Sequence, residues 1–255
     1  MEPLLAIEGL GFGYRGRPRL FSGLDLRVSP GELVGLIGPN GAGKTTLLEL
    51  ARGGLKPASG SVRLLGDDPR GLSPAERARR VACLLQRPQA PGASTVFDIV
   101  LGGRRPYRDL GGSSAEDEEL ALEAARRLGV EPWLERRGSE LSGGEYQRVL
   151  LARVVAQGTP LLLCDEPASS LDPKHLWATF RLLKSLARED GAAVLASVHD
   201  LPLAAAFCDR VVLLAEGRLR YDGGPEGLTD GLLSEAYGLG VRTVKTEAGV
   251  FFAYE

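Results

Sequence analysis

The stretch that decides the fold is Leu33-Val34-Gly35-Leu36-Ile37, followed directly by Gly38-Pro39-Asn40-Gly41-Ala42-Gly43-Lys44-Thr45. The first five residues are apolar throughout, which is typical of a strand buried on both faces in a parallel sheet. The next eight residues fit G-x-x-x-x-G-K-[ST] at every position, and a helical pattern follows until Gly53. A strand, a glycine loop and a helix in this order predict an α/β fold that binds a nucleoside triphosphate.

Each group in this loop has an expected role. The glycines let consecutive backbone N–H groups turn inward around the phosphates, and the helix adds the partial positive charge of its N-terminus. We expect Lys44 to reach the β- and γ-phosphates and to act in catalysis, and the Thr45 hydroxyl to ligate Mg²⁺. The residues expected to bind the nucleotide here are Gly38, Pro39, Asn40, Gly41, Ala42, Gly43, Lys44, Thr45 and Thr46.

Two adjacent acids end a second apolar stretch, Leu161-Leu162-Leu163-Cys164-Asp165-Glu166. A buried strand would carry Asp165 to the end of the sheet, where it can hold the hydration shell of Mg²⁺. Glu166, one residue further, is suited to orient and deprotonate a water molecule. Adjacent acids of this kind favour hydrolysis over transfer to a substrate hydroxyl, so the sequence predicts an ATPase.

The composition excludes several classes of protein. The 255 residues are 44% hydrophobic and 25% charged, as in a soluble globular domain, and the formal net charge of -2 argues against a nucleic-acid partner. Three widely spaced cysteines suggest neither disulfides nor a zinc site, and we expect them to be buried and reduced. We expect no signal peptide and no apolar run of the ~20 residues that span a bilayer, so work at a membrane would need another protein as the anchor.

The remaining pattern predicts a single domain over 1–255 with a helical insertion at about 87–157 and a C-terminal tail at about 226–255. Period-two alternation at 24–28, after β structure at 5–8, is typical of an antiparallel sheet. Buried strands are expected at 161–164, 193–198 and 210–214, with helices between them at 175–189 and 201–207. This strand–helix alternation predicts a parallel sheet.

A second glycine motif, Leu141-Ser142-Gly143-Gly144-Glu145, precedes another expected helix. Ser142 with the N–H groups of Gly143 and Gly144 at a helix start makes a second anion site. One nucleotide does not need two such sites in one chain. We therefore expect this site to close on ATP held by a second copy, giving a head-to-tail dimer with two sandwiched ATP molecules.

With this motif, the chain resembles the ABC ATPase family over essentially its whole length. The resemblance implies a P-loop NTPase (RecA-like) α/β core with an N-terminal antiparallel β subdomain and an inserted helical subdomain. Tyr14 falls where the family stacks an aromatic ring on adenine, with Phe12 as the alternative, and Gln86 falls at the glutamine loop that meets Mg²⁺. Asp172 falls in the loop that crosses the dimer, and His199 at the switch histidine that touches the γ-phosphate.

The stretch 95–107, TVFDIVLGGRRPY, resembles the ATPases of iron-siderophore, haem and cobalamin importers, with Gly103 as an extra residue. The alternative for this stretch is a plain polar turn after a helix. The resemblance implies a polytopic permease, through it a substrate-binding protein, and a peripheral position on the cytoplasmic face of the inner membrane. We expect the permease to dock at about 89–107, with Arg104 and Arg105 as docking residues.

Two other functions stay open. One is a soluble ABC ATPase of iron–sulfur cluster assembly, which would bind a soluble scaffold in place of a permease. The other is a regulatory domain that binds ATP without hydrolysing it, which the presence of Glu166 and His199 disfavours.

Overall fold

The computed structural model describes residues 2–84, 92–108, 112–169, 171–246 and 249–254. Its α-helices are α1 (Lys44–Ala51), α2 (Pro74–Arg80), α3 (Val96–Leu101), α4 (Ala115–Arg127), α5 (Gly143–Ala156), α6 (Pro173–Arg188), α7 (Leu201–Phe207) and α8 (Asp230–Tyr237). Its strands are β1 (Leu5–Phe12), β2 (Phe21–Val28), β3 (Leu33–Ile37), β4 (Ser59–Leu64), β5 (Val81–Leu84), β6 (Leu161–Asp165), β7 (Ala193–Ser197), β8 (Arg210–Ala215), β9 (Arg218–Gly223), β10 (Val241–Thr246) and β11 (Gly249–Tyr254). Short 3-10 helices are η1 (Gly102–Tyr107), η2 (Glu131–Trp133), η3 (Gly138–Glu140) and η4 (Pro225–Gly227).

A six-stranded sheet forms the centre of the fold, in the order β5-β6-β7-β3-β8-β9. The first five of these strands are parallel, and β9 joins β8 antiparallel at one edge. This confirms the parallel sheet predicted from the strand–helix alternation. Strand β5 is absent from the prediction, because periodicity cannot distinguish four apolar residues directly after a helix from the end of that helix.

Both faces of this sheet are buried, as the continuous apolar strands predict. Leu33 and Ile37 of β3 pack into the core formed with α5, α6 and α7, whereas Val34 and Leu36 pack into the core formed with α1 and the N-terminal strands. Every residue of β3, β6 and β7 is buried. The loops at the carboxyl ends of these strands therefore start from fixed positions, which is where ligands bind in open α/β sheets.

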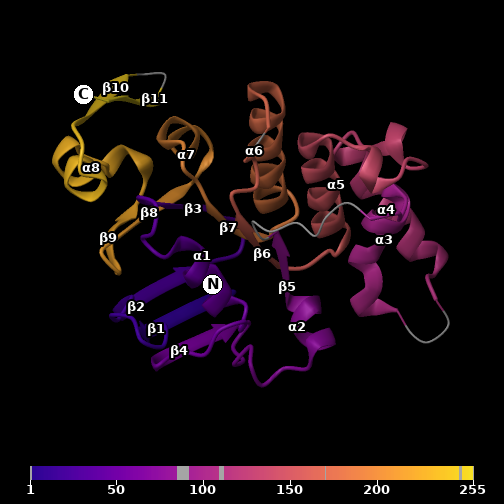
Figure 1. Ribbon diagram of the computed structural model, residues 1–255, viewed down its shortest axis with the longest axis horizontal. Coiled ribbons are helices and arrows are strands. Elements are labelled where there is room, and N and C mark those ends of the chain that lie inside the picture. The colour runs from indigo at the N-terminus through magenta and orange to yellow at the C-terminus, as the bar shows by residue number, and fades with distance from the viewer. Residues whose placement is uncertain (1, 85–91, 109–111, 170, 247–248, 255) are drawn as a thin grey trace.

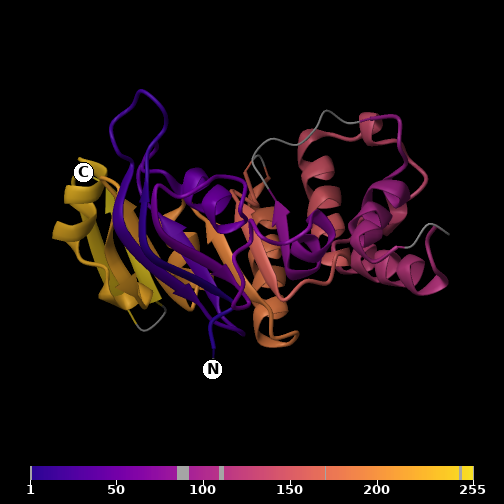
Figure 2. The same ribbon diagram turned by 90° about the horizontal axis from the view of Figure 1, so that it is seen from below.

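The N-terminal strands form a separate antiparallel sheet in the order β2-β1-β4. Along β2 the apolar residues are buried and the polar ones exposed, and the pairing confirms the antiparallel sheet predicted from the alternation at 24–28. The loop at 13–20, between β1 and β2, protrudes from this sheet and is the indigo loop of Figure 2. A hydrogen bond closes the base of this loop: the Leu20 N–H donates to the Phe12 carbonyl at 2.8 Å.

Helices α3, α4 and α5 gather at one end of the molecule, and α8 with the hairpin β10–β11 lies at the opposite end (Figures 1 and 2). The hairpin is a second element absent from the sequence-based prediction. Its strands pair from Val241↔Tyr254 to Thr246↔Gly249.

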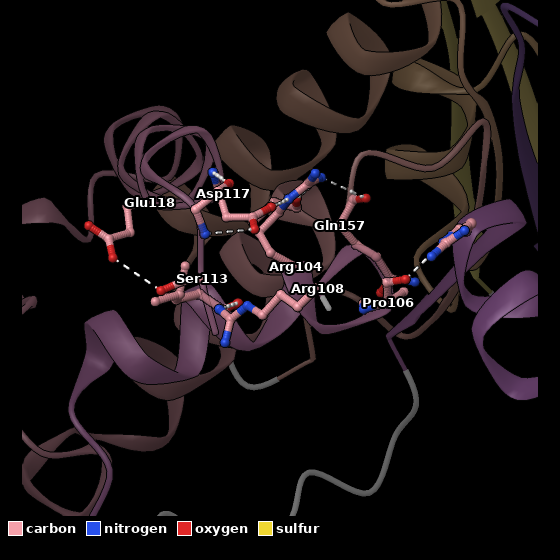
Figure 3. A network of polar contacts seen from close by, with 11 residues as sticks. Arg104, Pro106, Arg108, Ser113, Asp117, Glu118 and Gln157 are labelled. Carbon is pink, nitrogen blue, oxygen red and sulfur yellow. Dashed lines mark hydrogen bonds and ion pairs between the residues drawn. The ribbon is translucent and has the colours of Figure 1, made fainter. Parts of the chain in front are cut away.

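Arg104 ties the helical end together (Figure 3). Its guanidinium pairs with Asp117 at 2.9 Å and donates to two backbone carbonyls at the C-terminal end of α5. The side chains of Arg104 and Asp117 are only 12% and 9% exposed, and the hydrogen bond from Arg104 is the main reason that the pKa of Asp117 lies below its ordinary value. The expectation that Arg104 docks the permease is therefore wrong, because its charge is already engaged inside the subunit.

Candidate nucleotide-binding and catalytic site

The loop at 38–43, between β3 and α1, has a backbone that requires glycine at two places. Gly38 has a φ of 144°, and a Cβ there would lie 2.0 Å from the carbonyl oxygen of Leu214. Gly43 has a φ of 103°, and its Cβ would lie 2.7 Å from the ring of Phe21. The loop therefore runs too close to β8 and β2 for side chains, and α1 begins directly after it, which places a helix N-terminus at the loop.

Lys44 is the first residue of α1, and its side chain folds back onto this loop. Its Nζ donates to the carbonyl of Gly38 at 2.7 Å and to that of Pro39 at 3.0 Å, and the residue is 6% exposed. Burial lowers the pKa of Lys44, whereas the negative charges of Glu166 and Asp165 act in the opposite direction. The ammonium group is thus held in a partly desolvated position, where its attraction to a phosphate is stronger than in water.

Asp165, at the end of β6, accepts hydrogen bonds from two hydroxyls. Thr45 Oγ1 donates to Oδ2 at 2.7 Å, and Ser197 Oγ donates to Oδ1 at 2.6 Å. Asp165 is 1% exposed, so these donors satisfy a buried carboxylate. The Ser197 hydroxyl also accepts from the backbone N–H of Glu166 at 2.8 Å. Ser197 therefore positions both acids, a role that the sequence-based prediction missed.

Thr45 and Asp165 together fit a Mg²⁺ ion. Mg²⁺ takes oxygen ligands, usually one or two from the protein with water and phosphate oxygens completing the set. Thr45 and Asp165 would hold the ion, which would supply positive charge to offset that of the phosphates. Within the described part of the chain, no group of three or more His, Cys, Asp or Glu side chains could hold a metal. Gln86, the third expected ligand, lies outside the described residues.

Glu166 adopts an uncommon backbone conformation for a residue with a side chain, with a φ of 50°. Its Oε1 is hydrogen-bonded to Nε2 of His199, which follows β7. The side chains of Glu166 and His199 are 19% and 43% exposed. The Glu166 carboxylate is therefore held by its backbone on one side and by the His199 imidazole on the other.

These groups line one cavity of about 530 Å³. Its lining residues are Tyr14, Arg17, Pro18, Arg19, Leu20, Asn40, Gly41, Gly43, Lys44, Thr45, Thr46, Glu166 and His199. The structure therefore brings together the phosphate loop, the aromatic candidate and the two catalytic candidates that sequence reasoning selected separately. Arg17 and Arg19 were missed, and the available signal was the run of basic residues directly after Tyr14.

The two aromatic candidates differ in accessibility. Tyr14 is 44% exposed, and its hydroxyl shares a 3.0 Å hydrogen bond with the hydroxyl of Thr46. Phe12 is only 6% exposed and packs edge-on against Tyr14, with 5.0 Å between ring centroids. The exposed ring at the cavity supports Tyr14 over Phe12 as the adenine platform.

The segment at Ser142 does not contribute to the described lining of that cavity. Ser142 caps α5: its hydroxyl accepts from the N–H of Glu145 at 3.3 Å, and the carboxylate of Glu145 accepts from the N–H of Ser142 at 2.8 Å. These two bonds lower the pKa of Glu145. Ser142 and Gly143 are exposed, so the start of α5 is open to a ligand held by another molecule.

Asp172 also lies outside the described cavity lining. It caps α6, accepting from the N–H of His175 at 3.0 Å, and its other oxygen pairs with the imidazole of His175 at 2.7 Å. Both hydrogen bonds hold the pKa of Asp172 below its ordinary value. The predicted site residues thus fall into two groups, one around the phosphate loop and one on exposed helix starts.

Comparison with known proteins identifies the family of the chain. The family model described as ABC transporter matches residues 21–169. The chain is 42% identical over 233 residues to a hemin import ATP-binding protein of Bordetella avium, with 88% of each chain covered. It is 40% identical over 224 residues to a cobalamin import ATP-binding protein of Halobacterium salinarum, and the match covers 88% of this chain but only 56% of that protein. A solved structure described as a metal-chelate type ABC transporter, in an inward-facing conformation, has a TM-score of 0.85 at 27% identity, covering 100% of this chain and 97% of that one.

The fold and the cavity define a P-loop NTPase with an antiparallel β subdomain and a set of helices inserted between β5 and β6. The chain belongs to the ABC transporter family and is an ATPase cassette of that family. Within the described ranges, none of the helices has the length and apolar character needed to cross a membrane.

Proposed function

We propose that this chain hydrolyses ATP to drive import through a separate polytopic permease, with haem, cobalamin or an iron chelate as the cargo. The observation that carries the hydrolytic part is the hydrogen bond between His199 and Glu166 at the cavity that Lys44 and Thr45 line. The import part is supported by the named functions of the Bordetella and Halobacterium relatives. In this proposal the chain lies on the cytoplasmic face of the inner membrane, attached through the permease and, through it, working with a substrate-binding protein.

The chemical roles follow from the contacts. Glu166 would accept a proton from the attacking water, and His199 would hold the carboxylate in place and contact the γ-phosphate. Lys44 would exchange its carbonyl contacts for phosphate oxygens, since its ammonium group already lies within the loop. Ser197 would keep Asp165 and Glu166 in register with each other through the two hydrogen bonds that it makes.

The proposed active unit is a head-to-tail dimer. The described cavity lining contains the phosphate loop and Glu166 but no residue from the start of α5. The exposed start of α5 carries further backbone N–H donors that could bind a phosphate. Closing Ser142, Gly143 and Gly144 of one copy over the nucleotide of another would use both groups. Asp172, at the exposed start of α6, would then lie in the segment that crosses between copies.

A second cavity, of about 470 Å³, is the proposed docking site for the permease. It lies between α3, η1 and α5, and Arg105, Arg108 and Arg153 line it together with Asp98. Asp98 is engaged in capping α3 through Thr95, and the Nε of Arg108 is buried without a hydrogen-bond partner in the described structure. The cavity therefore carries excess positive charge and suits an acidic segment of the partner.

The apolar residues of α3 differ in position: Ile99 lines this cavity, whereas others face the core. Val96 is fully buried, and Phe97 packs against the same core. Both belong to the interior of the helical segment. Docking at this surface would then depend mainly on charge, with Arg105 among its exposed members.

The test is cargo uptake in vesicles that contain the permease that co-purifies with this chain, measured with haem, cobalamin and a ferric siderophore. Arg105→Glu should lower uptake at least about tenfold while the free subunit keeps its ATPase rate, because the charge reversal acts only on docking. Arg218→Glu, on the exposed edge of β9, is the matched control. Normal uptake with Arg105→Glu refutes the docking site. Purification with a soluble scaffold and no permease would favour the iron–sulfur alternative.

A further inference from the structure

Two arginines of the β1–β2 loop line the nucleotide cavity without an assigned role. Arg17 and Arg19 are exposed, and within the described residues neither guanidinium makes a hydrogen bond or an ion pair. Both belong to the β1–β2 loop and line the same cavity as residues 40–46, Glu166 and His199. Free cations that face a cavity are expected to have an anionic ligand.

The charge of the cavity gives a reason for them. Apart from Arg17 and Arg19, Lys44 is the one cationic side chain among the described lining residues, and Glu166 opposes it within the same cavity. Asp165 adds a second negative charge that acts on Lys44. Without the two arginines, the side chains of Lys44, Glu166 and Asp165 together would offer a polyphosphate no excess positive charge, which would then come only from the helix N-terminus and a bound Mg²⁺ ion.

The loop that carries these arginines has a defined shape. The N–H of Arg17 donates to the carbonyl of Tyr14 at 3.0 Å, and the Leu20 N–H closes the base of the loop on the Phe12 carbonyl. Pro18, between the two arginines, has a fixed φ and reduces the freedom of the loop. The backbone positions of the arginines are therefore largely set before a ligand binds, so ordering them costs little entropy.

We propose that Arg17 and Arg19 form a cationic wall, on the β1–β2 loop, that binds the polyphosphate chain of nucleoside di- and triphosphates in addition to the phosphate loop. This inference rests on the proposed nucleotide site and adds a second set of phosphate contacts to it. Tyr14 would hold the base, and the arginines directly after it would bind the phosphates. The wall would make the cassette select phosphorylated nucleotides over the nucleoside through charge as well as through the glycine loop.

The experiment is calorimetric titration of the full chain with ADP and with adenosine. Arg17→Ala and Arg19→Ala should each weaken ADP binding by about 3- to 10-fold, and the double variant by about 10- to 100-fold, because each removes an exposed charge–phosphate contact. Adenosine binding should stay within about twofold. Arg15→Ala is the matched control: it is an exposed arginine of the same loop that lies outside the described lining.

Two further measurements sharpen the outcome. The double variant should show a shallower dependence of ADP affinity on salt concentration, since fewer charge contacts are screened, and Arg19→Lys should keep most of the affinity. ADP affinity within twofold of wild type in the double variant would overturn the proposal. Equal losses for ADP and adenosine would also overturn it, because the loop would then only position Tyr14. Lys44→Ala, titrated in parallel, tests the nucleotide site itself, so failure of the arginine wall and failure of the site can be told apart.

Discussion

Arg104→Ala removes the side chain that joins η1, α4 and the end of α5. In the folded protein Arg104 holds the Asp117 carboxylate at 2.9 Å and two backbone carbonyls, and it lies 4.1 Å from the ring centroid of Tyr107. Removing one partner of a buried pair costs about 3–5 kcal/mol, because the other charge stays buried and unpaired. For a chain of this size that corresponds to a fall in melting temperature of about 6–20 °C.

The assay is urea or thermal unfolding of Arg104→Ala beside Arg105→Ala. The neighbouring arginine is exposed and makes no side-chain contact among the described residues, so its loss should change stability by no more than about 0.5 kcal/mol. A double-mutant cycle with Asp117→Ala separates the pair from the carbonyl contacts. Equal melting temperatures for the two arginine variants would refute the conclusion that Arg104 stabilises the contact between η1, α4 and the end of α5.

The same pair predicts a pH dependence. The pKa of Asp117 is lower in the folded chain than in the unfolded one, so its contribution is complete above the unfolded value of about 3.9 and is lost as the pH falls through the lower folded value. The stability difference between wild type and Asp117→Asn should therefore be constant near neutral pH and shrink below about pH 4. A difference that stays constant down to pH 2 would contradict the depressed pKa.

Three further substitutions test the site. Lys44→Ala should weaken ATP binding at least about tenfold in calorimetry, since it removes the ammonium group from the loop, and unchanged affinity would count against the loop's role. Ser197→Ala should cost about 1–3 kcal/mol of stability and at least about tenfold in the hydrolysis rate, because Asp165 and the Glu166 N–H both lose a partner; a fully active variant would exclude the positioning role. On a Glu166→Gln background, Ser142→Arg should keep the chain monomeric in ATP and Mg²⁺ by sedimentation without lowering its melting temperature. A dimer that survives this change, or forms without nucleotide, would contradict the sandwich.

The sequence predicts the central part of the fold well, because there local pattern and tertiary environment agree. Strands β3, β6 and β7 are apolar throughout and buried throughout, and the glycines at 38 and 43 are required by contacts with β8 and β2. The parallel sheet and the convergence of Lys44 and Glu166 on one cavity then follow from strand order. Such features are readable because a single physical requirement, burial or close approach, determines each residue.

The remaining features depend on partners that are distant in the sequence. Ser197 looks like an ordinary hydroxyl at the end of an apolar strand until β6 and β7 pair and place it beside Asp165. Arg104 and Arg105 are identical neighbours in the sequence, yet only the first meets a carboxylate from α4, thirteen residues away. Strand β5 is recognisable only through its pairing with β6. These contacts cannot be predicted from local pattern in a single sequence, because each depends on a residue that is distant along the chain.

The separation of the two anion sites has a consequence for inheritance. If each ATP is held by the phosphate loop of one copy and by Ser142 of the other, a mixed dimer of a Glu166 mutant and a Ser142 mutant collects both defects in one site and leaves the other site intact. The same two defects in one copy, paired with a normal copy, damage both sites. After a gene duplication, one daughter gene could therefore lose Glu166 and the other Ser142, while the dimer of their products keeps one intact ATP site. Selection would then preserve the pair as partners, and neither could be lost.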